Sequence, residues 1–185
     1  LVFVKNGVTL TIPAGTVLRG DKATQAALVV ERGGKLMAEG TVDKPIVFTS
    51  NQPAGQREPG DWGGVILLGK SPSNQPGDAS KGLAVGEGIV EGPDFSSAPD
   101  KGIYGGNNVN DNSGVLKYVR IEYGGIAYQP NVEINGLTLG SVGAGTKIDY
   151  VQVSYSGDDS YEWFGGTVEC KHLIAYITTD DDFDT

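Results

Sequence analysis

The sequence has 185 residues, of which 38% are hydrophobic and 20% are charged, so it can form one domain with a sizeable core and is not globally disordered. Its formal net charge of −9 argues against a nucleic-acid or anionic-membrane partner, and it has no apolar run of the roughly 18 residues that a membrane span needs. The single cysteine, Cys170, excludes an internal disulfide, and 29 glycines without a collagen period indicate many tight turns.

Short strands are the predicted elements along the whole chain. Apolar and polar residues alternate in short runs that are bounded by Gly, Pro, Asn or Asp, and helical spacing is nearly absent. In chain order, the clearest predicted strands are 8–12, 46–48, 65–67, 119–123 and 151–155. The sequence therefore predicts an all-β protein.

The main irregular region, 70–114, separates the third of these strands from the fourth. It is rich in Gly, Pro, Ser, Asn and Asp, with one strand-like piece at 88–90. A loop of this length is either a lateral excursion that packs on the domain or a binding loop. We predict one domain over 1–185 with a long loop insertion at about 70–114.

Three segments in the second half of the chain repeat one another. They are 116–123, 148–155 and 170–177, with offsets of 32 (148 − 116) and 22 (170 − 148) residues. The shorter offset is typical of one solenoid rung, and stacking in register at roughly 4.8 Å per rung would give such strands a shared core. We predict a right-handed, single-stranded parallel β-helix, a solenoid. An antiparallel sandwich or jelly roll is the alternative, because Asn6-Gly7 and Asn135-Gly136 could close hairpins.

Alternation within the repeats separates an interior face from outward columns. The residues assigned to the interior are 119, 121 and 123, their equivalents 151, 153 and 155, and 173, 175 and 177. Lys117, Asp149 and Lys171 form an outward column of alternating charge, which would help to hold the register between rungs.

Aromatic residues dominate the other outward columns. Tyr118, Tyr150 and His172 share one column, Arg120, Gln152 and Ile174 form the next, and Glu122, Ser154 and Tyr176 form a third. Such a face could bind sugars, because rings offer apolar faces and hydroxyl partners, although in-register stacking also simply stabilises parallel strands. The candidate ligand-binding residues are Tyr118, Tyr150, His172, Tyr176, Tyr161 and Trp163.

Neither His172 nor Cys170 stands out as a catalytic group. His172 is the only histidine, so it lacks the second histidine of a typical zinc site, and its column faces outward. Cys170 takes the position of Leu116 and Ile148, which predicts a buried corner residue and not a nucleophile.

Carboxylates gather near the end of the sequence. The offset of 22 places Asp158 over Asp180 and Asp159 over Asp181. Like charges so close are unfavourable unless a cation, a proton or solvent relieves them, and Ca²⁺ prefers such oxygen ligands. The alternatives are a Ca²⁺ site at Asp158, Asp159, Asp180 and Asp181 or a solvated acidic corner.

Several segments of the chain resemble bacterial surface β-helix proteins, which are common as exported proteins or lipoproteins of Bacteroidetes-type bacteria. The resemblance is carried by 10–17, 34–41, 44–50 and 60–65. It implies an extracellular or cell-surface location, associated with the outer membrane of a Gram-negative bacterium, and it supplies no catalytic set. Both ends of the sequence suggest a fragment of a longer chain, since it starts within an apolar alternation and stops after an acidic run.

Two functional hypotheses remain at this point. The first is a non-catalytic cell-surface module that binds a glycan or an outer-membrane or surface protein. The second is a polysaccharide lyase or glycoside hydrolase that acts on extracellular glycans with or without Ca²⁺, which is an analogy at the level of the fold.

Overall fold

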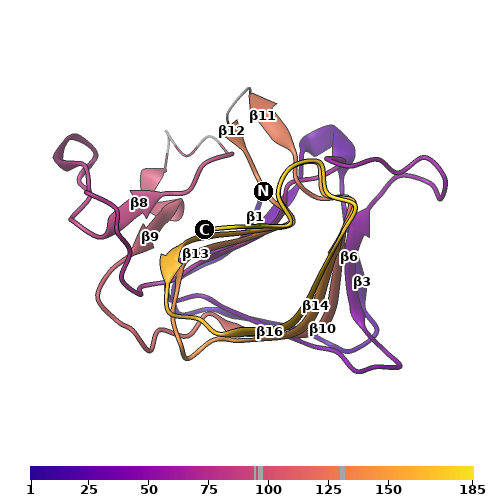
Figure 1. The fold of residues 1–185 in the computed structure, drawn as a ribbon, viewed down its shortest axis with the longest axis horizontal. Helices are drawn as coiled ribbons and strands as arrows, with labels where there is room; N and C mark the ends of the chain where they lie inside the picture. Colours follow the sequence, from indigo (N-terminus) through magenta and orange to yellow (C-terminus); the bar gives the residue numbers. More distant parts are fainter. Residues whose placement is uncertain (94, 96–97, 130–131) are drawn as a thin grey trace.

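The fold is a solenoid of parallel strands, seen in a computed structural model that describes residues 1–93, 95, 98–129 and 132–185. Figure 1 looks along the stack, so that strands of successive rungs overlie one another around a common interior. The first sheet has the order β1-β4-β7-β13-β15-β17. Its strands are β1 (Val2–Val4), β4 (Ala27–Val30), β7 (Gly64–Leu68), β13 (Leu137–Val142), β15 (Tyr161–Gly166) and β17 (Phe183–Asp184).

The remaining solenoid strands form a second, branched sheet. Its main path is β16-β14-β10-β5-β2, and β3 pairs with β6, which in turn pairs with the second half of β10. The strands are β2 (Thr9–Ile12), β3 (Val17–Gly20), β5 (Lys35–Glu39), β6 (Ile46–Ser50), β10 (Gly114–Glu122), β14 (Lys147–Ser154) and β16 (Cys170–Tyr176).

Every pairing within these two sheets is parallel, so the predicted β-helix is confirmed and the sandwich is excluded. Ile148 lies beside Cys170, as the offset of 22 required. Antiparallel pairing in the described ranges is confined to excursions: β8 (Glu87–Ile89) with β9 (Ile103–Gly105), β11 (Ala127–Gln129) with β12 (Val132–Glu133), and one isolated bridge. The helices described are three short 3₁₀ turns, η1 (Lys22–Thr24), η2 (Ala79–Lys81) and η3 (Pro99–Lys101).

The long strands β10, β14 and β16 each bend at one residue. Tyr118, Tyr150 and His172 adopt φ values of +49°, +54° and +51°, the left-handed conformation. This shifts the alternation, so that Leu116 and Val119, three residues apart, are both buried in the interior. The bend therefore lets one strand serve two faces of the solenoid.

The predicted interior face is confirmed for its first two positions and wrong for the third. Val119, Ile121, Val151 and Val153 belong to the core inside the solenoid, and Leu173 and Ala175 pack against it. The third positions have φ values of +60°, +56° and +54°, which turn their side chains to a corner; they are Tyr123, Tyr155 and Ile177.

The insertion between β7 and β10 packs against the outer face of the first sheet, where Figure 1 shows β8 and β9 beside the solenoid. A second core joins Ile66 and Leu68 of β7 to Val90 and Tyr104 of the insertion. Arg32 anchors the insertion through an ion pair with Glu87 at 2.5 Å and a hydrogen bond to the Gly105 carbonyl at 3.0 Å. The region is thus a packed excursion that covers one face of the solenoid.

Candidate functional site

Three rings stack along the outside of the bend, and we call Tyr118, Tyr150 and His172 the aromatic column. The Tyr118 and Tyr150 centroids are 4.7 Å apart at an interplanar angle of 15°, and those of Tyr150 and His172 are 4.1 Å apart at 8°. The predicted stacking is therefore present. Because the faces between neighbouring rings are occupied by one another, the column presents ring edges and polar tips along its length to a ligand.

A shallow groove of about 270 Å³ runs beside the aromatic column. The aromatic column lines it together with Arg120, Gln152 and Ile174 of the neighbouring column. Thr41, Val42 and Pro45 also contribute to its lining. Its volume lies just below the range of about 300–1,000 Å³ for sites that enclose a small molecule, so it fits contact with part of an extended chain better than enclosure.

Polar atoms of the column are available for binding. The Nδ1 atom of His172 lies 2.8 Å from the Oδ1 atom of Asp149. Since the ionised carboxylate can only accept, Nδ1 carries the proton and Nε2 is left as an acceptor in the neutral ring. Across the described ranges, the hydroxyls of Tyr118 and Tyr150 have no hydrogen-bond partner. The hydrogen bond from His172 lowers the pKa of Asp149, which keeps this carboxyl ionised.

The other three predicted ligand-binding residues do not join the aromatic column. Tyr161 is fully buried in the interior core, where its hydroxyl lies 2.8 Å from the Val151 carbonyl oxygen, and Trp163 packs against the same core. Alternation along β15 directs both side chains inward, so neither belongs to the surface that the sequence suggested. Tyr176 is exposed, but it lies at the end of β16 and contacts Tyr155 edge-on.

A second aromatic pair was missed from the sequence. Tyr123 and Tyr155 stack at 5.0 Å and 5° at the corner where their strands end. Their positive φ values remove them from the interior face. The repeated Tyr123-Gly124-Gly125 and Tyr155-Ser156-Gly157 could have signalled the end of a strand at these tyrosines.

Three of the four predicted acidic residues converge in the turns after β14 and β16, and we call Asp158, Asp159 and Asp180 the acidic corner. One carboxylate oxygen from each lies within 4.8 Å of the others. Burial, reinforced by Asp159, raises the pKa of Asp158 to about 7. The fourth predicted residue, Asp181, contributes its backbone amide, which donates to Asp159 Oδ1 at 2.8 Å. Such a set of carboxylate oxygens fits a hard cation such as Ca²⁺.

A second carboxylate group shares Asp159 and adds Glu162 and Asp184 from the outer face of β15 and β17. Burial, reinforced by Glu91, raises the pKa of Glu162 to about 8, and the Asn135 amide donates a hydrogen bond to it. Glu162 and Asp184 are again 22 residues apart (184 − 162), so the repeat itself could have revealed this pair.

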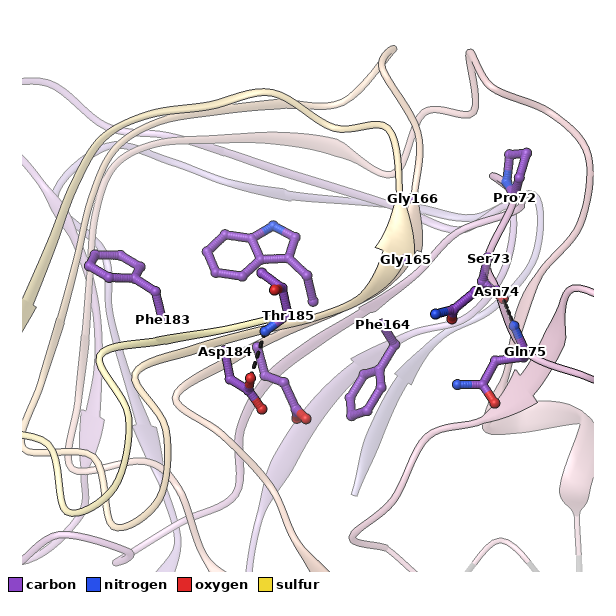
Figure 2. Close-up of a pocket in the computed structure, with 12 residues that line it drawn as sticks. Pro72, Ser73, Asn74, Gln75, Phe164, Gly165, Gly166, Phe183, Asp184 and Thr185 are labelled. Atoms are coloured by element: carbon purple, nitrogen blue, oxygen red, sulfur yellow. Dashed lines mark hydrogen bonds between the residues drawn. The ribbon is translucent and has the colours of Figure 1, made fainter.

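A wide hollow of about 1080 Å³ lies over the last described rung. Figure 2 shows Phe183 on one side of the final strands, with Phe164 and Asp184 on the other. Because Trp163 and Phe183 stack with the core residue Tyr161, part of this hollow is the aromatic end of the interior, and residues 72–75 of the insertion line another part.

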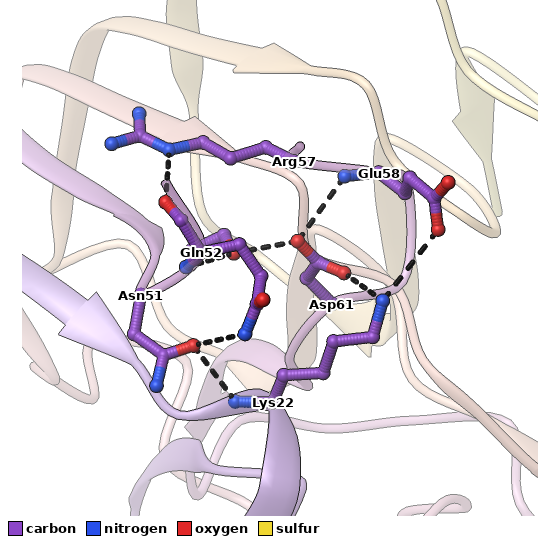
Figure 3. Close-up of polar contacts among 7 residues, drawn as sticks. Lys22, Asn51, Gln52, Arg57, Glu58 and Asp61 are labelled. Atoms are coloured by element: carbon purple, nitrogen blue, oxygen red, sulfur yellow. Dashed lines mark hydrogen bonds and ion pairs between the residues drawn. The ribbon is translucent and has the colours of Figure 1, made fainter. Parts of the chain in front are cut away.

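A buried polar network among the turns next to η1, β6 and β7 has a structural role. Asp61 lies at its centre, between Lys22 and Glu58 (Figure 3). Its carboxylate accepts from Ser50 Oγ at 2.6 Å and the Glu58 amide at 3.1 Å, and it is paired with Lys22 Nζ at 2.7 Å. Burial alone would raise the pKa of Asp61, but the hydrogen bonds from Lys22 and Ser50 outweigh it and lower the pKa. The network joins three turns, and all its principal groups are satisfied within the protein.

Comparison with known families agrees with this architecture. The sequence matches the family described as a pectate-lyase-like β-helix domain over residues 1–185. The chain belongs to this family. No significant match is found among curated proteins or solved structures. In the ranges that the structure describes, no helix has the length and apolar character to cross a bilayer. Family membership supports the β-helix domain and leaves its specific function to be argued from the site.

Proposed function

We propose that this β-helix domain is a non-catalytic cell-surface module that binds a glycan or a protein partner, with a carbohydrate chain lying along the aromatic column. The observation that carries the proposal is the groove lined by Tyr118, Tyr150 and His172. These residues place two hydroxyls and an imidazole at intervals of one rung. A regular polysaccharide presents equivalent hydroxyl groups at a fixed spacing along its chain. A column of side chains with its own fixed spacing can therefore bind such a chain along its length.

The chemistry of the groove favours carbohydrate over a folded protein partner. Its volume of about 270 Å³ suits one or two sugar units of a longer chain. Tyrosine hydroxyls and a histidine nitrogen can exchange hydrogen bonds with sugar hydroxyls, while ring edges and the exposed Ile174 contact sugar C–H groups. An extracellular location suits such a ligand and remains a prediction.

Removal of one hydroxyl tests the proposal with the least structural change. Tyr150→Phe keeps the ring stack and should weaken binding to the glycan selected from an array by about tenfold, as expected for one or two lost hydrogen bonds. Tyr176→Phe, which removes a hydroxyl at the far end of β16, is the matched control and should bind normally. Equal affinities of wild type and Tyr150→Phe, or absence of binding to any glycan, would reject the proposal.

A second candidate, a Ca²⁺-dependent polysaccharide lyase or a glycoside hydrolase, draws support from the acidic corner. Its carboxylate oxygens lie within 4.8 Å of one another, and the pKa of Asp158 is raised to about 7. That spacing is shorter than the roughly 5–9.5 Å between the two carboxyl groups of most glycosidases, which favours a shared proton or cation. A lyase would also need a base, for which Lys171 is the candidate in this part of the chain. Lys171 is the second residue of β16 while Asp180 follows the end of that strand, so the strand separates them.

A turnover assay distinguishes the two candidates. Formation of unsaturated sugar ends that requires Ca²⁺ and disappears in Asp180→Ala would establish the lyase. Release of reducing ends without unsaturation would indicate a hydrolase. Binding without turnover, which is lost in Tyr150→Ala and kept in Asp180→Ala, is the result expected for the non-catalytic module.

A further inference from the structure

The charged side chains beside the aromatic column compensate one another in a regular order. In register, Glu39 of β5 lies beside Lys117 of β10, Lys117 beside Asp149 of β14, and Asp149 beside Lys171 of β16. Signs alternate at every rung along this line, which we call the charge column. Each lysine in it therefore has an acidic neighbour one rung away.

The charges that line the groove beside the aromatic column are balanced in the same way. Arg120 donates to Glu122 from both Nε and Nη2, and the Nε to Oε1 distance is 3.0 Å. Above Arg120 in the same column stand the uncharged Gln152 and Ile174. His172 is hydrogen-bonded to Asp149. The cation nearest to the groove is thus matched by its own acidic partner.

Two further charged residues near this face also have opposite signs. Lys147 and Glu169 line one hollow together with Asp149 and Lys171. Lys117 and Lys147 both contribute to the low pKa of Asp149, after the hydrogen bond from His172. Among the described residues that line the groove and this hollow, there is therefore no cluster of unmatched cations for a polyanion and no cluster of unmatched acids for a polycation.

The charge distribution over the rest of the molecule also bears on which polymers this face can attract. The net charge of −9 is negative, while the face around the aromatic column is balanced, so the excess acids lie elsewhere, as at the acidic corner. Within a Debye length of about 8 Å at physiological ionic strength, the balanced face gives little attraction to a chain of carboxylates or ammonium groups. Binding at this face must then come from hydroxyl hydrogen bonds and C–H contacts.

From this charge pattern we infer that the glycan bound along the aromatic column is a neutral polysaccharide, without uronic acids or free amino sugars. The inference rests on the proposed function, and it names the ligand class of the same groove. It also assigns Asp149 a selective role: by matching Lys117 and Lys171, this carboxylate keeps the face uncharged on average.

The test compares three polymer classes on the wild-type protein by affinity electrophoresis and titration calorimetry. Neutral probes are galactomannan, arabinoxylan and hydroxyethyl cellulose; polygalacturonate is the polyanion and chitosan the polycation. We expect binding to at least one neutral probe, with an affinity that hardly changes between low and high salt. Tighter binding of polygalacturonate or chitosan would overturn the inference and leave glycan binding intact, whereas binding to no probe would count against the proposed function itself.

The variant Asp149→Asn tests the charge argument more directly, since asparagine can still accept the hydrogen bond from His172. It leaves Lys171 without its acidic neighbour and Lys117 with Glu39 alone, so binding to polygalacturonate should rise by about tenfold at low salt and fall again at high salt. Asp100→Asn makes the same change in net charge on η3 in the insertion and should not produce that gain.

Glu39→Gln provides an independent variant that does not contact His172. It removes the acidic neighbour of Lys117 on β5 and should also increase binding to polygalacturonate. If neither Asp149→Asn nor Glu39→Gln gains affinity for the polyanion while both remain folded, charge compensation does not set the ligand class and the inference fails.

Discussion

The carboxylate of Asp149 holds the imidazole of His172 through a hydrogen bond of 2.8 Å between Oδ1 and Nδ1. The two residues are 23 positions apart in the sequence and lie on neighbouring rungs. The same imidazole stacks on Tyr150 with an interplanar angle of 8°. Ring stacking and a charge-assisted hydrogen bond therefore fix both the plane and the tautomer of His172.

Replacement of this histidine should be visible in the titration of its partner. The hydrogen bond from His172 is the main reason that the pKa of Asp149 lies below its ordinary value of 3.8. His172→Phe keeps an aromatic ring on Tyr150 but removes that donor, so the pKa of Asp149 should rise toward 3.8. Carboxyl chemical shifts measured by NMR across the acid range check this, with Lys81→Gln, in η2 of the insertion, as a remote control. An unchanged pKa of Asp149 would mean that the pair does not persist in solution.

The acidic corner should make stability depend on pH. The folded pKa of Asp158 is about 7 against an ordinary 3.8, so the folded state binds this proton more tightly and loses stability as the pH rises through that interval. Asp158→Asn removes the effect. Its melting temperature should exceed that of the wild type at about pH 8 and equal it near pH 4.

Calcium and a control variant complete that experiment. If the acidic corner holds Ca²⁺, added calcium should raise the melting temperature of the wild type at about pH 8 more than that of Asp158→Asn. Asp43→Asn, at an exposed turn, should respond to neither pH nor calcium in this way. A lower melting temperature of Asp158→Asn at about pH 8 would contradict the predicted repulsion.

Tyr161 should contribute to stability through its hydroxyl as well as its ring. The hydroxyl oxygen lies 2.8 Å from the Val151 carbonyl oxygen and 3.1 Å from that of Ile174, so it links β15 to β14 and β16 across the interior. Tyr161→Phe should lower the free energy of unfolding by about 1–2 kcal/mol, because a buried hydrogen bond is lost. For a chain of this size, that corresponds to a fall of roughly 2–8 °C in melting temperature. Tyr176→Phe, at an exposed site, should melt like the wild type.

The start of β10 requires a glycine. A Cβ atom at Gly114 would collide with the backbone carbonyl oxygen of Leu36, and its φ of +115° disfavours a side chain. Gly114→Ala should reduce the free energy of unfolding by about 3 kcal/mol or more, since overpacking adds to backbone strain. Gly55, with φ +82° but open space around it, isolates the strain alone, and Gly55→Ala should cost only about 1–2 kcal/mol. Equal losses in denaturant titrations would show that the contact with Leu36 relaxes.

The architecture could be predicted because the relevant signals are local and repeat along the chain. The offset of 22 residues between the segments that begin at Ile148 and Cys170 corresponds to the register of β14 and β16. Equivalent residues on parallel rungs must lie one above the other, so the column of Tyr118, Tyr150 and His172 and the line of alternating charge could both be placed from residue numbers alone.

The direction of some side chains depended on where the backbone bends, and the alternation of apolar and polar residues in the sequence does not reveal those bends. Left-handed residues at Tyr118 and Tyr123 shift the phase of the strand, so Tyr123 and Tyr155 left the interior face to which strict alternation had assigned them. Conversely, Tyr161 and Trp163 were expected near the surface column, yet β15 belongs to the first sheet and directs them into the core.

The sequence by itself determined the rung length, the parallel register and the residues that share each column, because a period of one rung is a property of the chain. Only the tertiary structure decided which columns border a groove, how the insertion covers the first sheet, and that Glu162 and Asp184 join Asp159. Those relationships join residues of different sheets or of distant excursions. Their geometry is set by the bends of the strands and the packing between rungs, and the spacing of residues in a repeat does not give such distances.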